Sequence, residues 1–173
     1  GDLAYIVTNA SNKIELVNRY TFKSIATITT GLINPRFIAF ANGKGYVTNW
    51  GDPYNAADDY VAVINLATNT VESKIELNAT ANRLILENGK LYITEPNSST
   101  KLLIVTLATK AVETVEIGTS GDCLEEENGT LFILRAPFNA LGEIVKVKLS
   151  DKSVSRIPFP ESLAGASLMD IED

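Results

Sequence analysis

Hydrophobic and polar positions alternate along this chain in short runs, and the runs recur at a nearly constant step. Three runs rich in β-branched and aromatic residues each follow an Asn-Gly pair, in NGKGYVTN (42–49), NGKLYITE (88–95) and NGTLFILR (128–135). An Asn-Gly pair is a strong signal for a β-hairpin, because both central positions of the tight turn accept positive φ. The pattern therefore predicts one strand on each side of each pair.

Further strands are predicted by the apolar runs between the hairpins, several of which alternate apolar and polar residues as a half-exposed outer strand does. They are 36–40, 83–87 and 123–127 before Asn-Gly, 60–66 and 102–107 after it, and 71–77, 112–118 and 154–159 further on. A second turn-like segment keeps the same step, in LATNTV (66–71), LATKAV (107–112) and LSDKSV (149–154). Two independent features with one period indicate an internal repeat.

Four strands in roughly 40 residues, with recurring aromatic and turn residues, are typical of a β-propeller blade. We predict an all-β protein with a single propeller region over 1–173, built from four-stranded antiparallel blades whose strands A to D run from the inside outward. The blade units fall at about 1–30, 31–78, 79–118 and 119–160, and 161–173 supply a further inner strand, ASLMDIE (166–172). This is about four blades' worth. Either the last strand pairs back with the first unit and closes a ring, or the chain is a piece of a larger propeller.

The stretch NPRFIAFANGKGYVTN (34–49), followed by VAVINLATNTVESKIEL (61–77), resembles the YVTN-repeat propellers. Blades of that family carry a Pro, an apolar strand, a Gly turn, a Tyr-Val-Thr-Asn strand and an I-D-x-x-T-x-x-V strand and turn. The resemblance covers nearly the whole chain, although the third unit has Glu95 in place of the Asn and the fourth has FILR. It implies about seven blades, which favours a piece of a larger propeller.

The same resemblance implies a bacterial surface-layer-like or exported protein, on the cell surface, in the periplasm or attached as a lipoprotein. Some members of the broader group capture cobalamin. The composition agrees with a soluble globular region, with 45% hydrophobic residues. The formal charge of −6 argues against a nucleic-acid partner or an anionic membrane, and no run is apolar enough for direct membrane insertion.

The chain contains no histidine, which removes the commonest general base and metal ligand. The single Cys123 lies among carboxylates, which raise a thiol pKa, so we interpret it as structural. We therefore expect no enzyme activity, no cofactor and no metal site. The rival hypothesis is a propeller enzyme of the lactonase or quinoprotein kind, for which the chain offers only Asp122, Glu126 and Asp170 near the channel.

Binding is expected on one end of the blades. The A–B and C–D turns are short, whereas the B–C and D–A connections share the opposite end and vary in length, with the longest B–C loop over 49–59. Variable loops on a rigid scaffold carry recognition. The candidate ligand-binding residues on that end are the aromatic and arginine side chains Trp50, Tyr54, Phe138, Arg36, Arg83 and Arg135.

Structural explanations stay open for each candidate. A loop aromatic often covers its own loop, and the arginines have possible acidic partners in Asp122, Glu125 and Asp170. The oxygen-bearing residues Asp52, Asn55, Asp58 and Asp59 do not match the EF-hand spacing, so we interpret them as a solvated loop. The leading hypothesis is a non-enzymatic binding propeller for a small molecule, glycan or protein. The alternatives are cobalamin or glycan capture in nutrient uptake, the enzyme above, and a structural spacer.

Overall fold

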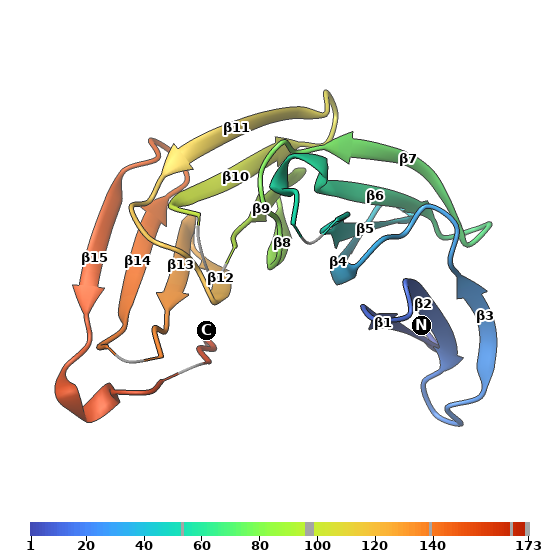
Figure 1. The fold of residues 1–173 in the computed structure, drawn as a ribbon, viewed down its shortest axis with the longest axis horizontal. Coiled ribbons are helices and arrows are strands. Elements are labelled where there is room, and N and C mark those ends of the chain that lie inside the picture. Colours follow the sequence, from blue (N-terminus) through green and yellow to red (C-terminus); the bar gives the residue numbers. More distant parts are fainter. Residues whose placement is uncertain (53, 96–98, 139, 167, 172–173) are drawn as a thin grey trace. The chain divides into compact units, whose positions relative to one another are not determined.

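The protein is described by a computed structural model that covers residues 1–52, 54–95, 99–138, 140–166 and 168–171. These residues form 15 strands, which lie in one three-stranded and three four-stranded antiparallel sheets, together with two short 3-10 helices (Figure 1). The chain divides into two compact units, Gly1–Asn82 and Arg83–Asp173.

The first unit contains two sheets, in which sequential strands are neighbours. The strands of the smaller sheet are β1 (Leu3–Thr8), β2 (Lys13–Asn18) and β3 (Ser24–Ile28), in the order β1-β2-β3. Those of the larger sheet are β4 (Pro35–Ala41), β5 (Lys44–Asn49), β6 (Tyr60–Asn65) and β7 (Thr70–Glu76), in the order β4-β5-β6-β7. The short helix η1 (Ala56–Asp58) lies in the β5–β6 loop.

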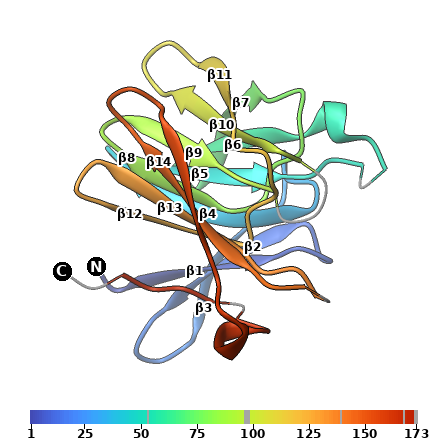
Figure 2. The same cartoon turned by 90° about the vertical axis from the view of Figure 1, so that its left-hand side faces the viewer.

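The second unit contains two four-stranded sheets with the same sequential order. The first consists of β8 (Leu84–Glu87), β9 (Lys90–Ile93), β10 (Lys101–Thr106) and β11 (Ala111–Glu116). The second consists of β12 (Cys123–Glu127), β13 (Thr130–Arg135), β14 (Glu143–Lys148) and β15 (Val154–Pro158), drawn from orange to red in Figure 2. The helix η2 (Glu161–Leu163) follows β15.

The predicted turns form because left-handed backbone recurs at fixed points of each repeat. Both residues of every Asn-Gly pair have positive φ, for example 50° at Asn42 and 74° at Gly43. The turn after each third strand has one such residue, with φ of 54° at Asn69, 59° at Lys110 and 60° at Lys152. Asn and Gly adopt this region at little cost, so the Asn-Gly pairs fix the hairpin turns, and Lys110 and Lys152 keep left-handed backbone at the later turns.

Each unit has its own hydrophobic core between its two sheets. In the first unit, Ile14 and Leu16 of β2 lie in one cluster with Val47 of β5 and Ile64 of β6, all completely buried. The second unit has an equivalent cluster that joins β9, β10, β12, β13 and β14. The sequence prediction of an all-β fold of antiparallel four-stranded blades is therefore confirmed, with about four blades' worth of sheets.

No strand forms in the described residues of the predicted inner strand over 161–173. Residues 161–163 form η2, and the described residues of 166–172, which exclude 167 and 172, belong to no strand. A strand needs a hydrogen-bonded neighbour, but the contact found here involves a side chain. The Cys123 thiol donates to the Met169 carbonyl over 3.4 Å, and Leu168 is 75% exposed. Alternating apolar residues, as in ASLMDIE, do not by themselves provide the backbone hydrogen bonds of a sheet. A single propeller region and a larger propeller stay predictions.

The buried cluster of the second unit should carry more stability than its exposed edge. Ile133 is completely buried in β13, whereas Ile157 on β15 is 48% exposed. We expect Ile133→Ala to lower the free energy of unfolding by about 2–5 kcal/mol, because it removes buried methyl groups and leaves a cavity. The matched Ile157→Ala variant should cost less than about 1 kcal/mol. Urea unfolding measures both, and equal losses would contradict the assigned core.

Candidate functional site

The β5–β6 loop meets two other connections of the first unit, as predicted for the B–C and D–A connections. The N–H groups of Trp50 and Gly51 donate to the carbonyls of Asn34 and Ile33 over 3.2 and 3.3 Å. Asp59, which is 2% exposed, accepts from Leu77 N–H at its carbonyl and from Ala81 N–H at its carboxylate. We call residues 33–36, 50–59 and 77–82 the loop end.

Arg36 and Trp50, two of the predicted residues, form a stack at this loop end. The guanidinium carbon of Arg36 lies 4.1 Å from the centroid of the Trp50 ring, a cation–π contact. Arg36 Nε also donates to Asn82 Oδ1 over 2.8 Å, and Asn82 is 5% exposed. The Asn82 carbonyl accepts from the Thr48 hydroxyl over 2.7 Å. Buried hydrogen bonds therefore hold the arginine against the indole.

The Trp50 ring carries a donor without a partner. Its Nε1 is buried and makes no hydrogen bond, although an indole N–H usually finds an acceptor when it leaves water. Its backbone is fixed by the bond to the Asn34 carbonyl, and one ring face is covered by Arg36. The ring is therefore held in place by packing and backbone bonds, while its polar atom has no hydrogen-bond partner among the described residues.

The oxygen-bearing side chains of the β5–β6 loop form hydrogen bonds with backbone N–H groups. Each of its oxygen-bearing side chains accepts from a backbone N–H: Asp52 from Tyr54 (3.0 Å), Asn55 from Ala57 (3.2 Å), Asp58 from Asp52 (3.1 Å) and Asp59 from Ala81 (2.9 Å). Gly51 has a φ of +60°, and a Cβ atom there would lie 2.5 Å from Asp58 Oδ1. These residues therefore order the loop. Among the described residues, no group of three or more carboxylate or thiol side chains is placed to hold a metal ion.

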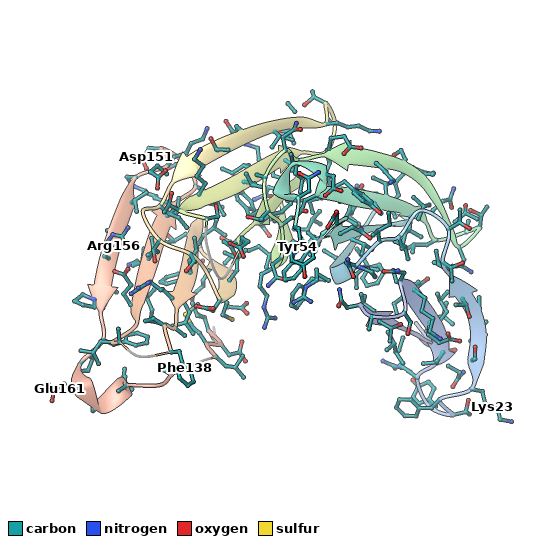
Figure 3. The ribbon with its side chains drawn as sticks, viewed as in Figure 1. Lys23, Tyr54, Phe138, Asp151, Arg156 and Glu161 are labelled. Carbon is teal, nitrogen blue, oxygen red and sulfur yellow. The ribbon has the colours of Figure 1, made fainter. Side chains whose placement is uncertain are left out.

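Tyr54 lies on this ordered loop and is 97% exposed (Figure 3). It does not fold back over the loop, which was the structural explanation left open for it. Its N–H is bonded to Asp52, so the side chain projects from a fixed backbone position. The structure thus places Arg36, Trp50 and Tyr54 at one loop end, with the first two in contact.

The remaining predicted residues belong to the second unit, which is described by itself. Arg83 Nε donates to the backbone carbonyl of Asp122 over 3.2 Å, and pairing of Arg83 with an acidic side chain stays a prediction. The Asp122 carboxylate accepts from Ala136 N–H over 2.6 Å. Arg135 ends β13, and Phe138, in the loop that follows, is 99% exposed.

Asn82 was missed by the sequence analysis. Asn82 and Asp122 each lie six residues before an Asn-Gly pair. Each accepts a hydrogen bond from the arginine near the start of the preceding repeat's inner strand, Asn82 from Arg36 and Asp122 from Arg83. This alignment was the available signal. The register of β4 with β5 shifts between Pro35 and Ile38, so Arg36 lies one residue further from its Asn-Gly than Arg83 does.

The carboxylate of Glu125 is held in an unfavourable setting in the second unit. Partial burial raises the pKa of Glu125 above its ordinary value, the negative charge of Asp170 raises it further, and the positive charge of Arg83 opposes both. Burial penalises the charged form of a carboxyl group, and a like charge adds to the penalty. The charge on β12 therefore has a cost in the folded state.

Comparison with known proteins bears on the fold. No family model and no curated protein sequence matches the chain. Among solved structures, hydrazine synthase of Kuenenia stuttgartiensis superposes with a TM-score of 0.79 at 11% identity, over 93% of this chain and 47% of that one. A chain of a nidogen/laminin complex gives 0.69 at 15% identity, over 95% and 62%. The WD40 domain of Toxoplasma gondii coronin gives 0.64 at 13%, over 91% and 44%.

The fold is a β-propeller fold. Likeness at these identities shows the fold alone, because one propeller architecture serves many functions. The chain spans about half the length of the propeller chains that it matches, from 44% to 62% for the three above. Within the described part of the propeller chain, no helix has the length and apolar character of a membrane span.

The stack can be tested through Trp50, because it is the chain's one tryptophan. Arg36→Gln removes the guanidinium from the ring face, so the fluorescence emission should move to longer wavelength and acrylamide quenching should rise as water reaches the indole. Arg83→Gln is the matched control in the second unit and should leave the spectrum unchanged. An unaltered spectrum in Arg36→Gln would show that the stack does not form in solution.

Glu125 predicts a pH dependence with a definite sign. Because its folded-state pKa is raised, its contribution to stability is fully present below the unfolded pKa and is lost as pH rises through the folded pKa. Glu125→Gln should therefore stabilise the protein more at pH 7 than at pH 4, as measured by urea unfolding. Asp170→Asn, which keeps Glu125, should remove part of the same pH dependence. A stabilisation that is equal at both pH values would contradict the assignment.

Proposed function

We propose that the chain is a non-enzymatic binding propeller that holds its partner at the loop end. The observation that carries the proposal is the Arg36–Trp50 stack, in which Asn82 holds Arg36 by a hydrogen bond. Tryptophan and arginine are the side chains most enriched at binding hot spots. A stack that is already assembled in the free protein loses little side-chain entropy when a partner arrives.

The exposed aromatics support this proposal. Tyr54 and Phe138 are 97% and 99% exposed, and each lies in a β–β loop of the type predicted to bind. Exposing a large aromatic ring to water is unfavourable unless a partner covers it. Tyr54 lies on a loop whose backbone is ordered by Asp52, Asn55 and Asp58, so binding need not order the loop first.

The partner class and the location belong to the same proposal. We infer a protein, glycan or small-molecule partner outside the cytoplasm, on a bacterial surface or in the periplasm, in keeping with the YVTN-type repeats. The formal charge of −6 favours a partner other than nucleic acid. Recognition rests on shape and polar contacts, and no bond is made or broken.

Exposed aromatic residues in the short turns, away from the loop end, provide matched controls. Tyr20 and Phe22, in the β2–β3 turn, are 67% and 74% exposed. After a glycan array and an extracellular extract have been screened with the whole chain, each ligand found is titrated by biolayer interferometry. Tyr54→Ser should weaken binding about tenfold or more, which is about 1.4 kcal/mol.

The control variants Tyr20→Ser and Phe22→Ser should bind as the unaltered chain does. Loss of binding in the controls together with full binding in Tyr54→Ser would place the site at the short turns. That result would overturn the proposal.

A further inference from the structure

A hollow of about 320 Å³ lies in the first unit, and none of its described lining residues belongs to the loop end. One wall is the end of β3 and the segment that follows it, and the other is the β6–β7 turn. The lining residues are Thr27, Ile28, Thr29, Thr30, Asn69, Thr70 and Val71. Its volume is at the lower end of the roughly 300–1,000 Å³ typical of small-ligand sites.

The second unit has the same junction, but an ion pair bridges it. Asn69 and Lys152 occupy the same left-handed turn position, with φ of 54° and 60°. Lys152 Nζ lies 2.6 Å from Glu113 Oε2, so the turn before β15 is tied to the outer strand β11. Asp151 and Arg156, labelled in Figure 3, mark this turn and strand.

Neither charge of that ion pair is present at the first unit's junction. Ala26 lies five residues before the left-handed Gly31, and Glu113 lies five residues before the left-handed Gly118. The two positions are therefore equivalent, and the first unit has Ala26 where the second has the carboxylate. Asn69 takes the place of the ammonium group. Two shorter side chains leave the junction open, and among the described residues that line it none carries a charge.

The lining chemistry is neutral and suited to hydroxyl groups. Thr29 and Thr30 are exposed, and a hydroxyl both donates and accepts hydrogen bonds. Asn69 Oδ1 is buried without a partner, which is unfavourable until a donor reaches it. Ile28, at 3% exposure, and Val71 supply an apolar wall.

We propose that this hollow binds a saccharide, as a second site apart from the loop end. A sugar ring brings hydroxyls that donate to the Asn69 amide oxygen and exchange hydrogen bonds with the threonines. Its C–H groups pack on Ile28 and Val71. A charged ligand finds no counter-ion there, and burying its charge costs more than burying a neutral hydroxyl that is hydrogen-bonded.

The test uses the whole chain and neutral methyl glycosides of glucose, galactose, mannose and N-acetylglucosamine, followed by two-dimensional NMR. A ring of this size binds in the millimolar range. At least one glycoside should shift the Asn69 side-chain amide and the backbone amides of 27–30 and 70–71. The methyl glycoside of glucuronic acid is the charged arm and should bind more weakly than the glucoside.

Asn69→Lys should close the hollow. The variant should fold, because the equivalent turns of the second unit have lysine at this left-handed position, Lys110 and Lys152. It should weaken glycoside binding at least tenfold. Asn88→Lys, which puts the same substitution at an exposed left-handed position of the second unit, should bind as the unaltered chain does. The double variant Glu113→Ala with Lys152→Asn should open the second junction and add shifts at 114–117 and 152–154.

Three results would overturn the proposal. One is the absence of saturable shifts at residues 27–30 and 69–71 with any of the neutral glycosides up to about 100 mM, far above a millimolar dissociation constant. Another is equal binding by Asn69→Lys and the unaltered chain. The third is tighter binding of the glucuronide than of the glucoside, which would contradict a neutral site.

Discussion

The burial of one sheet face against the next is the interaction on which the rest of this structure depends. A single four-stranded sheet cannot bury its apolar face alone, so repeated sheets are stable only when they pack on one another. In the first unit, Ile14 and Leu16 of β2 share one cluster with Ile64 of β6, and in the second, Ile104 of β10 shares one with Ile133 of β13. This packing gives each unit its core, and the left-handed turns set the strand ends between them.

Fixed strand ends divide the connections into two kinds. The Asn-Gly turns, such as those at Asn42 and Asn88, need few residues and leave little room for recognition. The connections at the other end vary in length, and the arginines that open β4 and lie just before β8 reach across to Asn82 and Asp122. Arg36 and Asn82, which join neighbouring repeats in the first unit, therefore also position Trp50, so the loop end combines a structural role with the proposed binding role.

The sequence predicted the fold well because its signals are local. Asn-Gly turns and β-branched runs act within a few residues, and they located nearly every strand. The stack of Arg36 on Trp50 and its bond to Asn82 depend on tertiary packing, so the sequence placed the residues at one end but did not predict their contact. The predicted strand at 166–172 also depends on tertiary packing, because a strand needs a partner that lies far away in the sequence, and its described residues form no strand. The open junction at Asn69 depends on Ala26 as well, which lies far away in the sequence, so no local signal predicts it.

The most direct test of the central claim is amide hydrogen exchange of the whole chain with and without a ligand found in the screening of extracellular partners. Packed strands should exchange slowly in both states. Added protection should fall on residues 33–36 and 50–59, with none at the Asn-Gly turns of 42–43, 88–89 and 128–129. Protection gained at those turns, with unchanged exchange over 50–59, would contradict the central claim.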